Sequence, residues 1–321
     1  NGHFDKLDFT LGSRWERYSV DKIESSKPVL RLGGHYKMSE GAHLRSSFAQ
    51  GYRFPTVAEM YSSSSAGELK VFPNPNVNPE SGWTSELGYK QLFNFNSKIR
   101  GYLDVALFQT RFNNMMEFTF GKWDSVPGAT LSNYGFTSLN VGPTRISGIE
   151  TILAGEVNLG EINIQSMLSH TYSNPISLDP EKEYEYDSDG EAMSFNSTSL
   201  DPSRRMLKYR YRNTVKGDIE AIWKTLSMGV SIRYNSFMEN IDAVFTDPLI
   251  SIFVPGVQDS RRDMAMTDGD MFVDLRSQYR FNENWKAQVG VLNVFNQLSS
   301  PRPALLSKSR SFMLQISYEL N

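Results

Sequence analysis

The stretch SFMLQISYEL, residues 311–320, decides the fold of this chain. Its apolar and aromatic residues occupy every second position from Phe312 to Leu320, and mostly polar residues stand between them. Successive side chains of a β-strand point to opposite faces, whereas helical spacing would mix the two sets. The stretch is therefore predicted to be a strand with one oily face and one wet face.

The same alternation recurs along the chain. It is clearest in residues 7–16, 215–223, 228–235, 271–281 and 285–291. Counting all such segments gives about twelve strands, each near the roughly ten residues that a tilted strand needs to cross a bilayer. We therefore predict an all-β chain in which residues 1–321 form one transmembrane, antiparallel, up-and-down β-barrel domain.

The connections between these strands are predicted to alternate strictly between short and long. The short turns are residues 39–41, 93–96, 158–160, 224–227 and 281–284. The long polar loops are residues 55–82, 121–140, 174–206, 236–270 and 297–309. Barrels of the bacterial outer membrane have tight turns on the periplasmic side and long loops outside, so both chain ends are expected in the periplasm.

The composition favours this prediction over other classes of protein. Hydrophobic residues are only 39%, yet aromatics reach 12%, as expected where alternate residues meet lipid and aromatic girdles mark both interfaces. No apolar run approaches the roughly 18 residues of a membrane helix. A soluble β-sandwich also alternates, but its strands are shorter. A net charge of -3 without a basic stripe excludes nucleic acid as a partner.

The chemistry-bearing residues do not point to an enzyme or to a cofactor. The chain has no cysteine, and its four histidines lack metal-ligand spacing. Asp187, Asp189 and Glu191 form a weak Ca²⁺ candidate, but Gly190 comes too early for an EF-hand. A solvated acidic loop is the favoured interpretation.

Four local motifs indicate what the barrel does. They are SSFAQGYRFPT at 46–56, NPNVNPES at 74–81 with SELGYK at 85–90, NVG at 140–142 with RISGIE at 145–150, and the final hairpin from 274 to 297. Each is weak alone, but they occur in a consistent order. In this order they resemble the barrel of TonB-dependent outer-membrane receptors.

The resemblance implies a fold and a function. Members of that family close 22 strands around a plug domain, so the strands here would be the C-terminal part of a larger barrel, with the plug and N-terminal strands missing. The chain also begins without a signal peptide, which suggests a processed chain or a fragment. The expected function is active uptake of a scarce nutrient across the outer membrane of a Gram-negative bacterium. The nutrient would be an iron chelate, haem, a corrinoid or an oligosaccharide.

The expected partners follow from the same resemblance. They are outer-membrane lipids, the TonB complex through the missing plug segment, the small-molecule or oligosaccharide ligand, and a surface lipoprotein. Loops on a rigid scaffold carry recognition, and aromatic and cationic groups suit bulky or anionic ligands. The candidate ligand contacts at the rim are Arg53, Tyr61, Arg111, Phe112, Phe237 and Arg261.

Charged residues on the wet face are expected to point into the barrel. They line the wall against which a plug packs or past which a solute moves, or they simply hydrate a water-filled interior. These residues are Arg45, Glu86, Lys90, Arg100, Asp104, Glu150, Arg233, Asp274 and Arg276.

Two other functions remain open on the sequence. One is a passive pore of about twelve strands. The other is an outer-membrane hydrolase, for which His170 beside Ser169 is the candidate at an outer strand end.

Overall fold

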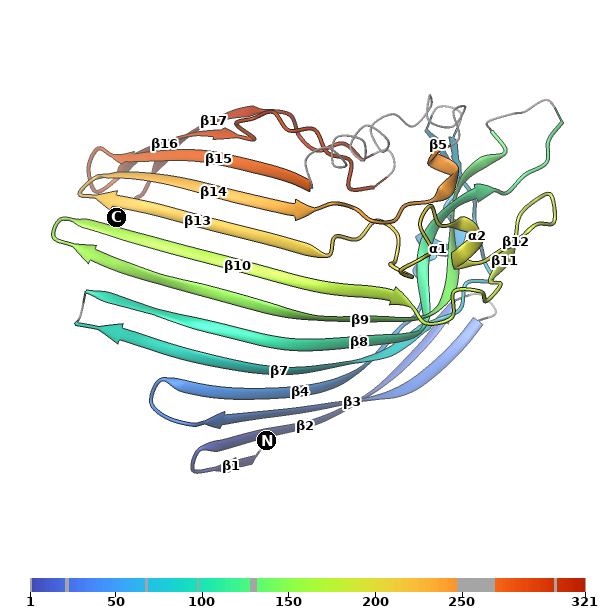
Figure 1. The fold of residues 1–321 in the computed structure, drawn as a ribbon, viewed down its shortest axis with the longest axis horizontal. Coiled ribbons are helices and arrows are strands. Elements are labelled where there is room, and N and C mark those ends of the chain that lie inside the picture. The colour runs from blue at the N-terminus through green and yellow to red at the C-terminus, as the bar shows by residue number, and fades with distance from the viewer. Residues whose placement is uncertain are drawn as a thin grey trace.

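The computed structural model describes residues 2–20, 23–66, 69–96, 98–127, 132–246, 269–302 and 305–320. Its main feature is one curved antiparallel sheet in which strands that follow each other in the sequence lie side by side (Figure 1). The strands are β1 (Gly2–Phe4), β2 (Leu7–Val20), β3 (Ile23–Lys37), β4 (Ala42–Arg53), β7 (Glu80–Phe95), β8 (Ile99–Lys122), β9 (Tyr134–Leu159), β10 (Ile162–Ser177), β13 (Asn213–Trp223), β14 (Leu226–Ser236), β15 (Gly269–Arg280), β16 (Trp285–Leu292) and β17 (Ser311–Tyr318). The up-and-down arrangement is confirmed, and all strands except the short β1 account for the twelve expected.

The smaller elements all lie in the long connections, which gather at one end of the sheet (Figure 1). They are α1 (Val57–Tyr61), β5 (Ser64–Ala66), β6 (Leu69–Val71), β11 (Glu185–Tyr186), β12 (Ala192–Met193), α2 (Phe195–Thr198) and the 3-10 turn η1 (Ala243–Thr246). Among the described residues, no helix is long and apolar enough to cross a membrane.

One face of the sheet is apolar and uncovered. In β17, Phe312, Leu314 and Ile316 are 79%, 70% and 63% exposed, and the apolar sets of the other strands are similarly open. A soluble protein would bury such a continuous surface, whereas a membrane strand turns it to hydrocarbon. This face is called the outer face below.

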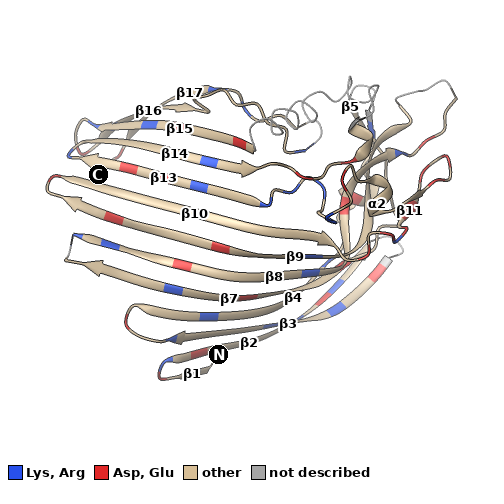
Figure 2. Cartoon of the chain, in the orientation of Figure 1, with Lys and Arg blue, Asp and Glu red and all other residues tan. Residues whose placement is uncertain are grey.

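The opposite, inner face carries ion pairs between strands that are adjacent or separated by one strand. Arg276 on β15 contacts Asp218 and Glu220 on β13, both at 2.8 Å. Arg45 on β4 contacts Glu86 on β7 at 3.0 Å and Asp104 on β8 at 2.7 Å. Figure 2 shows charged residues spaced along the strands. The expected inward direction of these charges is confirmed.

The turns at the other end of the sheet are tight because their residues adopt left-handed backbone angles. Gly160 and Lys224 begin two-residue turns and have φ values of 65° and 52°, and Asn96 begins a three-residue turn and has a φ of 53°. Two-residue hairpin turns need positive φ to match the twist of the strands. The short turns therefore lie where the sequence placed them.

The prediction of strict alternation is wrong at one hairpin and inexact at another. Val20 pairs with Ile23, so β2 and β3 are joined by a two-residue connection at the end where a long loop was expected. β8 and β9 also continue pairing to Lys122 and Tyr134, well inside the loop predicted for residues 121–140. That ribbon remains paired past a bulge near Met115, because backbone pairing satisfies its N–H and C=O groups beyond the membrane.

The two faces can be distinguished by adjacent substitutions in β10. Leu168 is on the outer face and Met167 on the inner face, and they are 52% and 43% exposed. In the full-length protein, Leu168→Lys is expected to lower the free energy of unfolding by about 2–4 kcal/mol, because it places a charge in hydrocarbon. Met167→Lys is expected to cost less than about 1 kcal/mol. Denaturant unfolding in lipid bilayers measures both, and equal costs would contradict the assignment of the faces.

Candidate functional site

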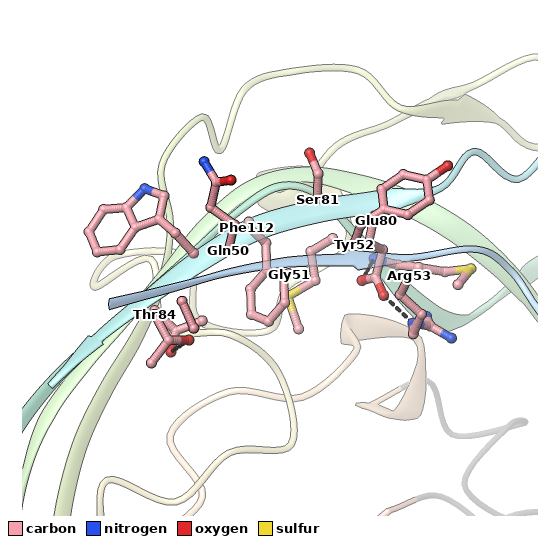
Figure 3. Close-up of a pocket in the computed structure, with 14 residues that line it drawn as sticks. Gln50, Gly51, Tyr52, Arg53, Glu80, Ser81, Thr84 and Phe112 are labelled. Carbon is pink, nitrogen blue, oxygen red and sulfur yellow. Dashed lines mark hydrogen bonds and ion pairs between the residues drawn. The ribbon is translucent and has the colours of Figure 1, made fainter. Parts of the chain in front are cut away.

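A first hollow lies on the inner face near the outer ends of β4 and β7 and beside the middle of β8. Its volume is about 620 Å³, and it is lined by Phe112 and by the hydroxyl pair Thr84 and Thr110, which are 2.9 Å apart. Figure 3 shows Thr84 on the concave side of the sheet, whereas Gln50 and Ser81 point away from it. The hollow mixes an aromatic ring, methyl groups and hydroxyls, a lining suited to a medium-sized organic ligand.

Arg53 borders this hollow, but two carboxylates hold its guanidinium group. Its Nη1 lies 2.8 Å from Glu59. Its Nε lies 2.5 Å from Glu80 (Figure 3). Glu80 also accepts a 2.6 Å hydrogen bond from the backbone N–H of Met116. Arg53 therefore ties β4, β7 and α1 together at the rim, and its charge is already neutralised.

The helix that Arg53 anchors is capped at its start and fixed at its end. Thr56 and Glu59 form a capping box, and Met60 is fully buried. Burial acts to raise the pKa of Glu59, but hydrogen bonds from Thr56 and Arg53 outweigh it and lower that pKa below its usual value. The next residue, Tyr61, is 40% exposed at the end of α1.

A second hollow of about 630 Å³ lies on the inner face of β13 to β16, under residues 293–301 and 305–309. Lys216 and Arg233 stand directly opposite each other on β13 and β14 and both line it. The Arg233 guanidinium lies 4.7 Å from the centre of the Phe272 ring. Within the described ranges, neither cation has a carboxylate partner.

Like charges that face each other across strands are unfavourable unless an anion neutralises them. Lys308 and the hydroxyls of Ser307 and Ser309 also border this second hollow, whereas Asp274 is its one acidic lining residue. From the sequence, Arg233 was predicted only as an inward charge, and Lys216 was not among the candidates. A search for cations opposed in the register of neighbouring strands would have found both.

The long loops after β10 and β14 form a core of their own above the sheet. Phe120, Met238, Ile241 and Phe245 are buried together, and Phe237 packs against them. These four buried residues are called the loop core below. Phe237 therefore contributes to packing between loops at the place where a ligand contact was predicted.

A buried ion pair fastens the same two loops. Lys208 Nζ lies 2.5 Å from Asp242, which also accepts a 2.6 Å hydrogen bond from the Tyr209 hydroxyl. Burial lowers the pKa of Lys208, but Asp242 raises it more, so the pKa of Lys208 lies above its usual value. Burial and the Asp242 carboxylate both raise the pKa of Tyr209 well above its usual value. The loops thus hold a charged, hydrogen-bonded lock.

The remaining candidates from the sequence are dispersed. Arg111 lies on the outer face, opposite in direction to its neighbour Phe112, and Arg261 lies outside the described residues. Ser169 and His170 are consecutive in β10 and point to opposite faces, so they cannot act as a nucleophile and its base. His170 instead lies 3.0 Å from the Asn213 side chain.

The acidic loop is held by its own backbone and by a lysine. Asp187 accepts 2.9 Å hydrogen bonds from the N–H groups of Asp189 and Glu191, and Lys122 contacts Asp189 at 2.6 Å. In the part of the chain that the structure describes, no three metal-ligating side chains converge.

The comparison with known proteins identifies this architecture. The family described as "TonB dependent receptor-like, beta-barrel" matches residues 1–294. The chain belongs to this family of TonB-dependent receptors. The family consists of outer-membrane transport receptors, and the apolar outer face places these strands in that membrane.

Individual relatives are more distant. The receptor chain is 25% identical to the ferric-pyoverdine 358 receptor of Pseudomonas putida over 304 residues, which are 91% of this chain and 30% of that protein. It is 27% identical over 121 residues, 37% of this chain and 11% of the relative, to hemoglobin and hemoglobin-haptoglobin-binding protein A of Haemophilus influenzae. The structure of the siderophore receptor PiuA from Acinetobacter baumannii superposes with a TM-score of 0.60 at 17% identity, covering 98% of this chain and 41% of that one. The chain thus spans less than half of the length of these relatives.

The Arg53 contacts can be tested through α1. Arg53→Gln leaves Glu59 and Glu80 without their shared cation, and amide exchange in residues 57–62 is expected to rise about fivefold, a loss of about 1 kcal/mol for a half-exposed pair. The pKa of Glu59 is lower in the folded protein than in the unfolded chain, so its charged form stabilises the folded state. This stabilisation is fully present above the unfolded pKa of 4.5, and it is lost as the pH falls through the lower, folded pKa. Arg53→Lys keeps the charge and should restore part of the protection. Protection in Arg53→Gln equal to wild type would refute the anchoring role.

The role of the buried ion pair between Lys208 and Asp242 in holding the two loops together can be tested by mutation. Asp242→Asn leaves the Lys208 ammonium buried without a counter-charge, and it is expected to destabilise the loops by about 3–5 kcal/mol. Hydrogen exchange in residues 195–212 and 237–246 measures this loss. The matched control, Lys208→Met with Asp242→Leu, removes both charges and should retain most of the protection. Unchanged exchange in Asp242→Asn would show that the pair does not hold the loops.

Proposed function

We propose that this chain forms part of the wall and the outer loops of a receptor that imports an iron chelate or haem, with transport driven through TonB. Family membership supports transport, and the names of the relatives, a ferric-pyoverdine receptor and a haemoglobin-binding protein, favour these two ligand classes over a corrinoid or an oligosaccharide. Inner wall hollows beneath packed loops suit the capture of a ligand from outside.

The proposed whole protein is a larger barrel. Within the described residues, the sheet is open, with β1 and β17 at its two ends. An open edge would leave backbone N–H and C=O groups unsatisfied in hydrocarbon, so further strands must pair with these edges. The family resemblance supplies them as the N-terminal strands of a 22-stranded barrel, with residues 1–321 as its C-terminal barrel domain. It also supplies the plug that would contact the TonB complex.

The opposed cations Lys216 and Arg233 carry the proposal for the ligand. Both face the interior, both lack an acidic partner among the described residues, and the buried Phe272 ring holds the Arg233 guanidinium from below. An anionic chelate would neutralise the pair through charge-assisted hydrogen bonds. Phe112, which lines the first hollow, and Tyr61, at the end of α1, are the further candidate contacts. Arg53 holds α1 through Glu59.

The passive pore and the hydrolase are less well supported. A pore of twelve strands would require pairing between the two edges of the sheet, and β1 and β17 do not meet in the described part. The hydrolase loses its candidate because Ser169 and His170 face opposite sides. A surface lipoprotein partner stays a prediction.

Uptake by cells tests the proposal directly. Cells that lack their own receptors and express the full-length protein are expected to accumulate radioactive iron from an anionic ferric chelate, or from haem, only while the inner membrane is energised. Uptake that continues after the proton gradient is collapsed would favour a passive pore instead. Cells with an empty vector give the background.

The ligand site is tested by removing its two cations. Lys216→Gln with Arg233→Gln is expected to weaken binding of an anionic ferric chelate by about tenfold or more, because each charge-assisted contact contributes about 1.5 kcal/mol or more. Arg280→Gln with Lys286→Gln removes another opposed inner pair at the turn end of the sheet and should leave binding unchanged. Titration calorimetry on the full-length receptor measures both. Equal affinities for wild type and the first variant would exclude this site.

A further inference from the structure

Two arginines also oppose each other on the outer face, on the side away from the proposed ligand. Arg111 on β8 and Arg145 on β9 are directly paired in the register of the sheet. The alternation of β8 places Arg111 on the same side as Leu103 and Leu107, which are 36% and 54% exposed on the outer face. The two guanidinium groups therefore share one place on the lipid-facing surface.

Among the described residues, neither arginine has a side-chain partner. Most arginines that face the interior are paired with carboxylates, as Arg45 and Arg276 are. Arg111 and Arg145 form no ion pair among the residues that the structure describes. The Nε of Arg145 is, in addition, buried without any hydrogen-bond acceptor. Like charges directly opposed across two strands are unfavourable, so this pair calls for an anion from outside the chain.

The height of the pair on the sheet indicates where that anion comes from. On β8 the outer face is apolar up to Leu107, and it changes to Gln109 and Arg111 above. At about 3.3 Å per residue and a tilt of about 40°, the strand from Ile99 to Arg111 rises about 30 Å. That rise slightly exceeds an apolar band of about 25 Å, so Arg111 lies at the level of the lipid headgroups.

An aromatic neighbour marks the same level. Trp83 on β7 is the register partner of Arg111, and its ring packs against Phe48 with the centroids 5.9 Å apart. Tryptophan concentrates at the membrane interface because its ring is apolar and its N–H is polar. Trp83, Arg111 and Arg145 thus form a row across three strands at the outer edge of the lipid band.

We propose that Arg111 and Arg145 bind a phosphate group on the headgroup of a lipid in the outer leaflet. Two guanidinium groups can each present paired N–H donors to phosphate oxygens, and the phosphate neutralises both charges at once. The acyl chains of the same lipid would lie on Leu107 and the apolar surface beneath it. This site faces away from the interior, so it is independent of the imported ligand and assigns Arg111 a different role from the ligand contact predicted from the sequence.

The test compares lipid binding and stability in matched variants of the full-length receptor. Native mass spectrometry with bisphosphorylated lipid A is expected to show about tenfold less bound lipid for Arg111→Gln with Arg145→Gln than for wild type, because charge-assisted hydrogen bonds are lost. Dephosphorylated lipid A should bind both proteins equally weakly. The control Arg17→Gln removes an outer-face arginine that is paired with Glu24, and it should retain wild-type lipid.

Thermal unfolding separates loss of the site from loss of the fold. In phosphate-free detergent without lipid A, the double glutamine variant should unfold at the same temperature as wild type or higher, because the charge repulsion is gone. Added lipid A should raise the unfolding temperature of wild type but not of the variant.

Three results would overturn the proposal. They are equal lipid A retention in the double variant, an equal loss in Arg17→Gln, and displacement of the lipid by millimolar inorganic phosphate. The last result would make the pair a site for free phosphate and not for a lipid.

Discussion

A strand that crosses hydrocarbon must have each backbone N–H and C=O bonded to a neighbouring strand, because no water is available there to replace the missing partner. The ladder meets this demand for every strand that has a neighbour on both sides, and it also determines what the side chains do. One set of alternate residues contacts lipid and must be apolar. The other set faces the interior and is free to carry charge. The long strands, the exposed apolar outer face and the inward ion pairs all follow from that single requirement.

Among the described residues, charges on the inner face then divide into those that pair with an opposite charge and those that do not. Arg45 contacts carboxylates on β7 and β8, and Arg276 reaches across β14 to two carboxylates on β13, so each arginine ties three successive strands together. Lys216 and Arg233 face each other in the register of β13 and β14, and two positive charges do not stabilise this pairing. A protein wall of this kind can tolerate opposed cations only where solvent or an anion compensates them. The unpaired groups are therefore where binding proposals belong, on the inner face for the ligand and on the outer face for lipid phosphate.

The outer loops depend on the wall in a different way. Phe120 lies in the part of β8 that continues beyond its predicted end, and its side chain belongs to the loop core. The extended pair of β8 and β9 therefore supplies the surface on which the loops pack. The pair of Lys208 and Asp242 then joins loops that are far apart in the sequence. Arg53 performs a comparable task for α1 at the other side of the rim. These contacts hold the outer loops in place around the two hollows on the inner face of the sheet.

The amino-acid sequence by itself determined the strands, their faces and most of their turns, because a period of two and tight-turn residues are local properties. Its motifs also indicated the family. It did not determine which side chains meet. Arg53 and Phe237 were both predicted as ligand contacts; Arg53 lies between Glu59 and Glu80, and Phe237 packs on the loop core. Whether a cation faces a carboxylate or another cation depends on the register between strands and on loops that return from elsewhere, and no single stretch of sequence contains that information. Only the tertiary structure could therefore set Lys216 opposite Arg233 and Arg111 opposite Arg145.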